Sequence, residues 1–182
     1  MRNLEALTKE QASEETGKIF DAVKAKIGMV PNLYATIGNS SKALNAVLTL
    51  GDNLGGGEFS NKEIEAVALA VSEFNNCDYC LAAHTAIGKM NGLTEEDTIA
   101  IRTGQVKDNK LNALTKLATE ITEKRGVPSQ ETVDAFFAAG YNKAALAELI
   151  GLVALNTFNN YTNNIADTEV DFPKAPALPE LA

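Results

Sequence analysis

The sequence has few of the side chains that carry out acid–base or nucleophilic chemistry near neutral pH. Its 182 residues contain one histidine, His84, and two cysteines, Cys77 and Cys80. Proton transfer near neutral pH must therefore use that imidazole, a thiol or a carboxyl group with a shifted pKa. Because the three residues fall within one eight-residue stretch, we interpret them as parts of a single site.

Long apolar runs and basic clusters are also missing. No apolar stretch approaches the roughly 20 residues of a membrane-spanning helix, and the first five residues lack the apolar region of a secretory signal. The formal net charge of −8 argues against nucleic acid and anionic membrane surfaces as partners. Two closely spaced cysteines without a signal suit a reducing compartment, so we expect a cytoplasmic protein with no nucleic-acid or membrane partner.

Strand signals are absent as well, because no run of alternating β-branched residues is followed by a hairpin turn. Apolar residues instead recur at helical spacing between start and stop signals, such as Ser60 with Glu63 and Gly126 with Pro128. The length and apolar content allow one domain with a substantial core. We therefore predict a single all-α domain, residues 1–182, with about eight helices.

The reactive residues lie at helical spacing after an Asn75-Asn76 break between two apolar helices, and this pair can cap the second helix, which we expect to begin at Cys77. Cys77 and Cys80 are i, i+3 neighbours, and Cys80 and His84 are i, i+4 neighbours, so all three share one helix face. Free backbone N–H groups at the helix start favour a thiolate. The imidazole can accept the thiol proton, Glu65 on the preceding helix can orient the imidazole, and the second thiol can convert a sulfenic acid into a disulfide. This pattern predicts a redox site.

The same residues have two other interpretations. Buried cysteines often serve as small core residues, and a single histidine is often a hydrogen-bonded polar group without a chemical role. A Cys-x-x-Cys pair with a histidine and a carboxylate can also hold zinc, although structural zinc sites usually stabilise small, loop-rich modules. We favour the redox site and expect no metal and no cofactor.

A second stretch of the chain resembles the first. Residues 68–76 are matched by residues 152–160, with an identical Phe-Asn-Asn triplet and mostly matching apolar positions. At the positions equivalent to the two cysteines and the histidine, the second copy has Tyr161, Asn164 and Thr168. The sequence therefore predicts a degenerate internal duplication, with an active unit at about residues 58–93 and a structural copy at about residues 129–168.

The last stretch, residues 169–182, has prolines at every third position: Pro173, Pro176 and Pro179. This spacing is typical of polyproline II structure and excludes a helix. Because such a segment has no internal hydrogen bonds, we expect an extended arm that docks on another surface, such as that of a neighbouring subunit.

Glu65, Cys77, Cys80 and His84 together form the pattern Glu-x11-Cys-x2-Cys-x3-His. This pattern resembles the motif of the carboxymuconolactone decarboxylase superfamily, specifically its alkylhydroperoxidase D-like branch. The resemblance is strong over about residues 58–93, and the all-α duplicated plan extends it more weakly over most of the chain.

The resemblance implies an alkylhydroperoxidase D-like helical fold and a thiol-dependent peroxidase, which reduces organic hydroperoxides or hydrogen peroxide. In that family, the residues matching His84 and Glu65 relay protons to the cysteines. The family also implies a dithiol reductant, such as a lipoyl-bearing or thioredoxin-like protein, and a homo-oligomer, as a trimer or hexamer. Tyr79 departs from the pattern, because the best-known peroxidases have histidine there; we expect Tyr79 to be an auxiliary residue that offers a neutral hydroxyl.

Other functions use the same residues differently. A protein disulfide oxidoreductase or redox sensor would apply the dithiol to protein partners. A carboxymuconolactone decarboxylase-type lyase usually lacks the cysteine pair and works with a histidine. A non-enzymatic helical oligomer would use neither the dithiol nor the histidine. For a peroxidase, we expect Cys80 to attack, because His84 lies one turn away. Cys77 would then exchange with the reductant, since a bulky donor could reach the tip of the helix.

Overall fold

The computed structural model describes residues 4–179, and over that range the chain forms nine α-helices and no strand, which confirms the predicted all-α class. The helices are α1 (Glu14–Ile27), α2 (Asn32–Ile37), α3 (Ser41–Leu54), α4 (Asn61–Phe74), α5 (Asp78–Met90), α6 (Glu95–Thr103), α7 (Asn109–Glu123), α8 (Gln130–Ala138) and α9 (Lys143–Ala166). Within the described range, no helix has both the length and the apolar character that a membrane span requires.

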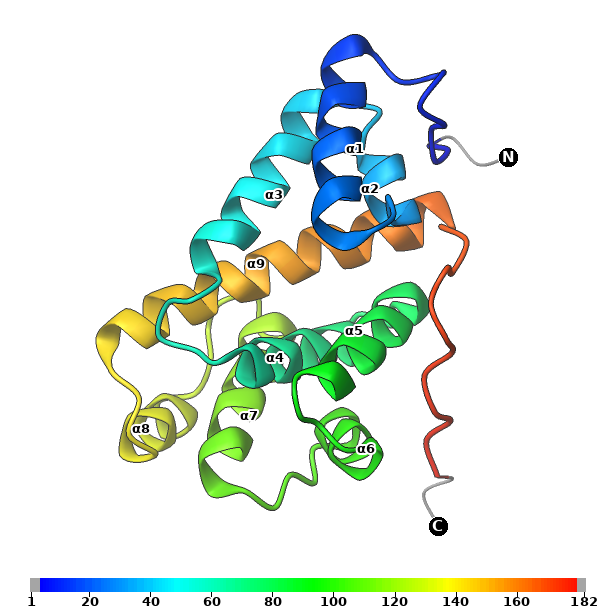
Figure 1. Ribbon diagram of the computed structural model, residues 1–182. Helices are drawn as coiled ribbons and strands as arrows, with labels where there is room; N and C mark the ends of the chain where they lie inside the picture. Colours follow the sequence, from blue (N-terminus) through cyan, green and yellow to red (C-terminus); the bar gives the residue numbers. More distant parts are fainter. Residues whose placement is uncertain (1–3, 180–182) are drawn as a thin grey trace.

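The long helix α9 runs between two groups of helices (Figure 1). Helices α2 and α3 contact it on one side, and α4, α5 and α7 contact it on the other. The larger apolar cluster lies mainly between α4, α7, α8 and α9 and includes Leu69, Leu114 and Phe136. A smaller cluster joins α1, α2 and α3 to the first turns of α5, and both cysteines belong to it. The predicted site therefore lies where the two groups of helices meet.

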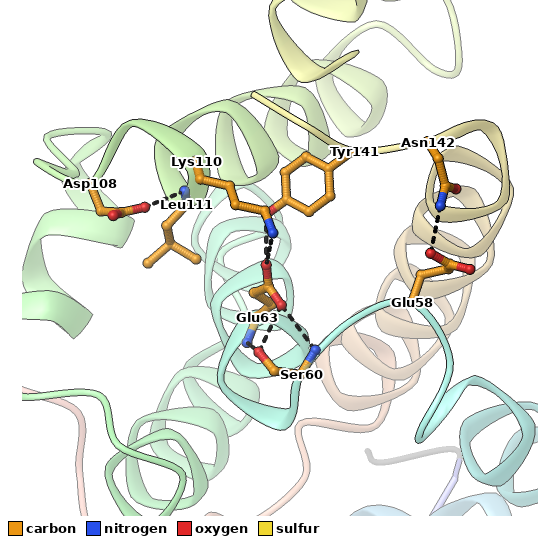
Figure 2. Close-up of polar contacts among 8 residues, drawn as sticks. All are labelled: Glu58, Ser60, Glu63, Asp108, Lys110, Leu111, Tyr141 and Asn142. Atoms are coloured by element: carbon orange, nitrogen blue, oxygen red, sulfur yellow. Dashed lines mark hydrogen bonds and ion pairs between the residues drawn. The ribbon is translucent and has the colours of Figure 1, made fainter. Parts of the chain in front are cut away.

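The start of α4 is fixed by the predicted capping box. Ser60 N donates to Glu63 Oε2 (2.9 Å), and Glu63 N donates to Ser60 Oγ (3.3 Å). Figure 2 shows that Glu63 also accepts from the hydroxyl of Tyr141 (2.8 Å), and that Asn142 donates to Glu58 (2.7 Å). These contacts tie the start of α4, the helix that carries Glu65, to the segment just before α9.

The break between α4 and α5 occurs at the predicted Asn-Asn pair. Asn76 has φ +51°, a left-handed conformation that asparagine adopts more readily than most residues. The cap of α5 differs from the prediction, because Cys77 occupies the N-cap position and its Sγ accepts from Cys80 N (3.3 Å). The second Phe-Asn-Asn triplet lies inside α9, which continues without a break to Ala166. The internal duplication stays a prediction.

The C-terminal arm has neither helix nor strand over residues 168–179 and lies along the same chain (Figure 1). Asp171 accepts from the first backbone N–H of α2 (2.8 Å), Phe172 packs against the smaller apolar cluster, and the carbonyl of Pro176 accepts from an arginine of α6 (2.6 Å). The described part of the extended arm therefore packs on its own chain, and docking on a neighbouring subunit stays a prediction. The rest of the predicted tail, residues 180–182, lies outside the described residues.

Candidate active site

Cys77 and Cys80 form a disulfide at the start of α5, with their Cα atoms 5.3 Å apart. The i, i+3 spacing thus brings the two sulfur atoms together as expected. Cys77 is 0% exposed and Cys80 is 2% exposed. A closed pair of sulfur atoms inside an apolar cluster is protected from bulk solvent, so the surrounding side chains control its chemistry.

His84 and Glu65 form the predicted pair. His84 Nδ1 lies 2.8 Å from Glu65 Oε2, and the two side chains are 21% and 12% exposed. Lys62 and Arg102 pair with other carboxylates, those of Asp97 and Glu73. Because Nδ1 is engaged by Glu65, Nε2 is the ring nitrogen that can exchange a proton with a thiol or a substrate.

Gly88 lies on α5 one turn beyond His84. A Cβ atom there would lie 2.8 Å from Leu93 Cδ1, closer than packed atoms normally come, and 3.5 Å from Glu65 Cβ, an ordinary van der Waals distance. The missing side chain therefore makes room for Leu93 beside the level of the relay.

Tyr79 is almost fully buried, and its hydroxyl accepts from Leu33 N (3.3 Å) at the start of α2. Its ring packs edge-on against Phe172, with ring centroids 5.8 Å apart. Burial first, and then the neighbouring carboxylate of Asp171, raise the pKa of Tyr79 well above its ordinary value. Tyr79 is thus neutral, as expected, and it connects the first turn of α5 to α2 and to the C-terminal arm.

Sequence reasoning missed one residue that contacts the disulfide. Asn163 of α9 is buried, and its Nδ2 lies 3.2 Å from Cys80 Sγ and 3.8 Å from Cys77 Sγ. The signal that could have found it is the recurrence of buried asparagines at three- and four-residue spacing on an otherwise apolar helix, at Asn156, Asn160 and Asn163.

The expectation that a bulky donor reaches Cys77 at the helix tip is wrong for this chain, because Cys77 has no exposed surface. The α9 helix and the smaller apolar cluster cover it. Of the four motif residues, His84 is the most exposed. Among residues 4–179, no group of three or more histidine, cysteine, aspartate or glutamate side chains is arranged to hold a metal ion.

Comparisons with known proteins support the fold. An uncharacterized peroxidase-related protein from Silicibacter sp. TM1040 has a TM-score of 0.75 at 22% identity over 92% of both chains. The alkylhydroperoxidase AhpD core of Ralstonia eutropha JMP134, also an uncharacterized peroxidase-related protein, has a TM-score of 0.81 at 18% identity over 91% of this chain and 90% of its own. The debrominase Bmp8 has a TM-score of 0.78 at 18% identity over 94% and 93%. At these identities the likeness establishes the fold.

A search of curated protein sequences finds no significant match. Residues 41–124, from the start of α3 to the end of α7, match the profile of the carboxymuconolactone decarboxylase family. The matched segment contains Glu65, Cys77, Tyr79, Cys80 and His84. The chain is therefore similar to the carboxymuconolactone decarboxylase family over residues 41–124, and its fold is the helical fold of the alkylhydroperoxidase D-like proteins.

Proposed function

We propose that the chain is a thiol-dependent peroxidase that reduces hydroperoxides with the Cys77–Cys80 dithiol. The observation that carries the proposal is the disulfide one helical turn from His84, whose Nδ1 is held by Glu65. A dithiol that becomes a disulfide gives up two electrons, which is the number needed to reduce a hydroperoxide to an alcohol and water. The imidazole supplies the proton transfer that this reduction requires.

The reaction starts from the reduced protein. His84 accepts the thiol proton of Cys80, and the thiolate attacks the terminal oxygen of the hydroperoxide. The S–O bond forms as the O–O bond breaks, and the departing alkoxide takes the proton from His84 and leaves as an alcohol. The thiol of Cys77 then attacks the sulfenic sulfur, the S–S bond forms, and hydroxide leaves with the Cys77 proton as water.

In sum, one hydroperoxide and two thiols give one alcohol, one water and one disulfide. A dithiol reductant, such as a lipoyl-bearing or thioredoxin-like protein, returns two electrons and two protons. Because both sulfurs are buried, this exchange requires a local opening of the cover over the disulfide. A small hydroperoxide enters beside His84, the most exposed of the four residues.

Glu65 acts through His84. Its carboxylate accepts the proton of Nδ1, so the neutral ring keeps Nε2 free as the proton acceptor. The same contact holds the ring on the face of α5 that carries the two cysteines.

The test measures four activities of one protein preparation, each in the presence of an excess of a small dithiol reductant. The proposal predicts turnover of cumene hydroperoxide, which Cys77→Ser and Cys80→Ser each abolish. Three other reactions represent the competing functions: reduction of insulin disulfides, decarboxylation of carboxymuconolactone and debromination of 2,3,4-tribromopyrrole. The last is included because the debrominase Bmp8, one variant of which is known in complex with that compound, shares the fold. Turnover of any of these three without turnover of the hydroperoxide would contradict the proposal.

A further inference from the structure

The amide of Asn163 meets the two sulfur atoms unequally. Its Nδ2 is 3.2 Å from Cys80 Sγ but 3.8 Å from Cys77 Sγ. Asn163 comes from α9, more than 80 residues further along the chain, so neither the helix α5 nor its capping brings the amide to this place. The contact is a product of the tertiary fold.

Other asparagines hold α9 in position on both sides of this contact. Asn160 Nδ2 donates to Ser72 Oγ (3.1 Å) and Asn160 Oδ1 accepts from Asn75 Nδ2 (2.9 Å). Asn164 Nδ2 donates to the backbone carbonyl of Asn75 (2.9 Å). The segment that joins α4 to α5 is therefore fastened to α9 immediately before and after Asn163. The amide of Asn163 has little freedom to move away from the sulfurs.

The polar atoms of the Asn163 side chain make few and weak hydrogen bonds in the disulfide form. Its Oδ1 is buried and has no hydrogen-bond partner among the described residues. A disulfide sulfur is only a weak acceptor for its Nδ2. A buried amide in this condition costs free energy that a leucine of similar shape would not cost. The cost is recovered when the acceptor carries a charge, because a hydrogen bond to an ionised group is roughly twice as strong as a neutral one.

Cys77 already has a donor of its own. Its Sγ caps α5 and accepts from Cys80 N (3.3 Å), and the dipole of α5 favours negative charge at that position. Without another contribution, local helix geometry would make Cys77 the thiolate. Asn163 supplies a donor from outside the helix, and that donor lies nearer to Cys80.

We propose that Asn163 is a further functional residue of this site, whose amide stabilises the thiolate of Cys80 in the reduced protein and so makes Cys80 the attacking sulfur. The inference rests on the proposed function only in naming Cys80 as the thiol that attacks a hydroperoxide. The preference for charge on Cys80 is a property of the reduced protein and can be measured without any peroxide.

The experiment measures the pH midpoint of alkylation by iodoacetamide, which reacts with the thiolate. Two backgrounds are used, Cys77→Ser to follow Cys80 and Cys80→Ser to follow Cys77. Asn163→Leu should raise the midpoint of Cys80 by about one pH unit, the lower end of the value of a hydrogen bond to a charged group. The midpoint of Cys77 should move by less. Asn163→Asp, which puts an acceptor in place of the donor, should raise the midpoint of Cys80 further.

Asn156→Leu is the matched control. Asn156 is a buried asparagine of the same helix, but its Nδ2 donates to the carbonyl of Leu152 in its own helix (2.8 Å). Its replacement should leave both midpoints unchanged. An equal shift from Asn156→Leu, an unchanged Cys80 midpoint in Asn163→Leu, or a larger shift for Cys77 than for Cys80 would overturn the proposal.

A second measurement needs no substitution and decides the question if the variants do not fold. In the reduced wild-type protein, the side-chain amide resonances of Asn163 should titrate with the alkylation midpoint of Cys80. Resonances that do not change across that pH range would overturn the proposal. A protein that shows the alkylation shift but does not consume hydroperoxide would refute the proposed function alone, whereas the reverse result would refute only the role of Asn163.

Discussion

Replacing Glu65 with glutamine removes one negative charge from the relay and leaves a side chain of nearly the same size. The glutamine carbonyl can still accept from His84 Nδ1, so the ring keeps a partner. The substitution therefore tests the charge of Glu65 rather than its volume. We expect Glu65→Gln to keep the fold and to slow the reaction of the reduced protein with cumene hydroperoxide.

The expected size of the effect follows from the geometry. The contact between Glu65 and His84 is 2.8 Å, and the two side chains are 12% and 21% exposed, so solvent weakens it little. A hydrogen bond to a charged group contributes about 1.5–3 kcal/mol. The upper end of that range corresponds to roughly a 10²-fold loss of rate, which is also the lower limit of general acid–base catalysis.

The assay is stopped-flow measurement of thiol oxidation in the wild type, Glu65→Gln, His84→Ala and the double variant. His84→Ala should be at least as slow as Glu65→Gln. The double variant should be little slower than the slower single variant, because residues that act as one unit are not additive. Glu73→Gln is the matched control, because Glu73 also lies on α4 and pairs with a cation, Arg102 (2.6 Å). Equal rates for wild type and Glu65→Gln, or equal losses for Glu65→Gln and Glu73→Gln, would refute the relay.

Three further predictions concern the scaffold. Phe172→Ala should lower the free energy of unfolding by about 1–2 kcal/mol in urea titrations, because the edge-on contact of Phe172 with Tyr79 is lost; an unchanged value would mean that the arm does not stabilise the chain. Burial raises the pKa of Glu63, but hydrogen bonds from Ser60 and Tyr141 outweigh burial and hold this pKa below its ordinary value. The Glu63 carboxylate therefore stabilises the fold above its unfolded pKa, and this stabilisation is lost as the pH falls through its folded pKa. The destabilisation caused by Glu63→Gln should therefore be smaller at about pH 3 than at about pH 6 in the same titrations, and an equal cost at both would contradict this. Phe158→Glu should reduce the size of the proposed homo-oligomer in light scattering, because α9 presents a row of exposed side chains at helical spacing: Ile150, Ala154, Phe158, Tyr161 and Ile165. Equal sizes for wild type and variant would place the subunit contact elsewhere.

Local signals in the sequence were sufficient to predict most helix starts. Ser60 caps the helix that it was expected to cap, and Thr94, Asp108 and Ser129 cap α6, α7 and α8 through the same local pattern, because capping depends on residues only three positions apart. The pairing of Glu65 with His84 was also predictable, since both lie on consecutive helices joined by a short break.

Long-range contacts were not predictable in the same way. Asn163 meets Cys80 across more than 80 residues, and no local pattern links the two positions. The burial of Cys77 likewise depends on α9, so an argument from its place at a helix tip gave the wrong exposure. The course of the arm depends on partners in α2 and α6, which the proline spacing does not identify.

The most direct test of the proposed dithiol chemistry is the mass and thiol content of the reduced protein after one equivalent of cumene hydroperoxide. We predict that each protein chain loses both free thiols and two hydrogen atoms in mass, and that one equivalent of the alcohol appears. Peptide mapping should place the new bridge between Cys77 and Cys80. Full retention of the thiols, or bridges only between different chains, would contradict the proposal that this dithiol reduces hydroperoxides.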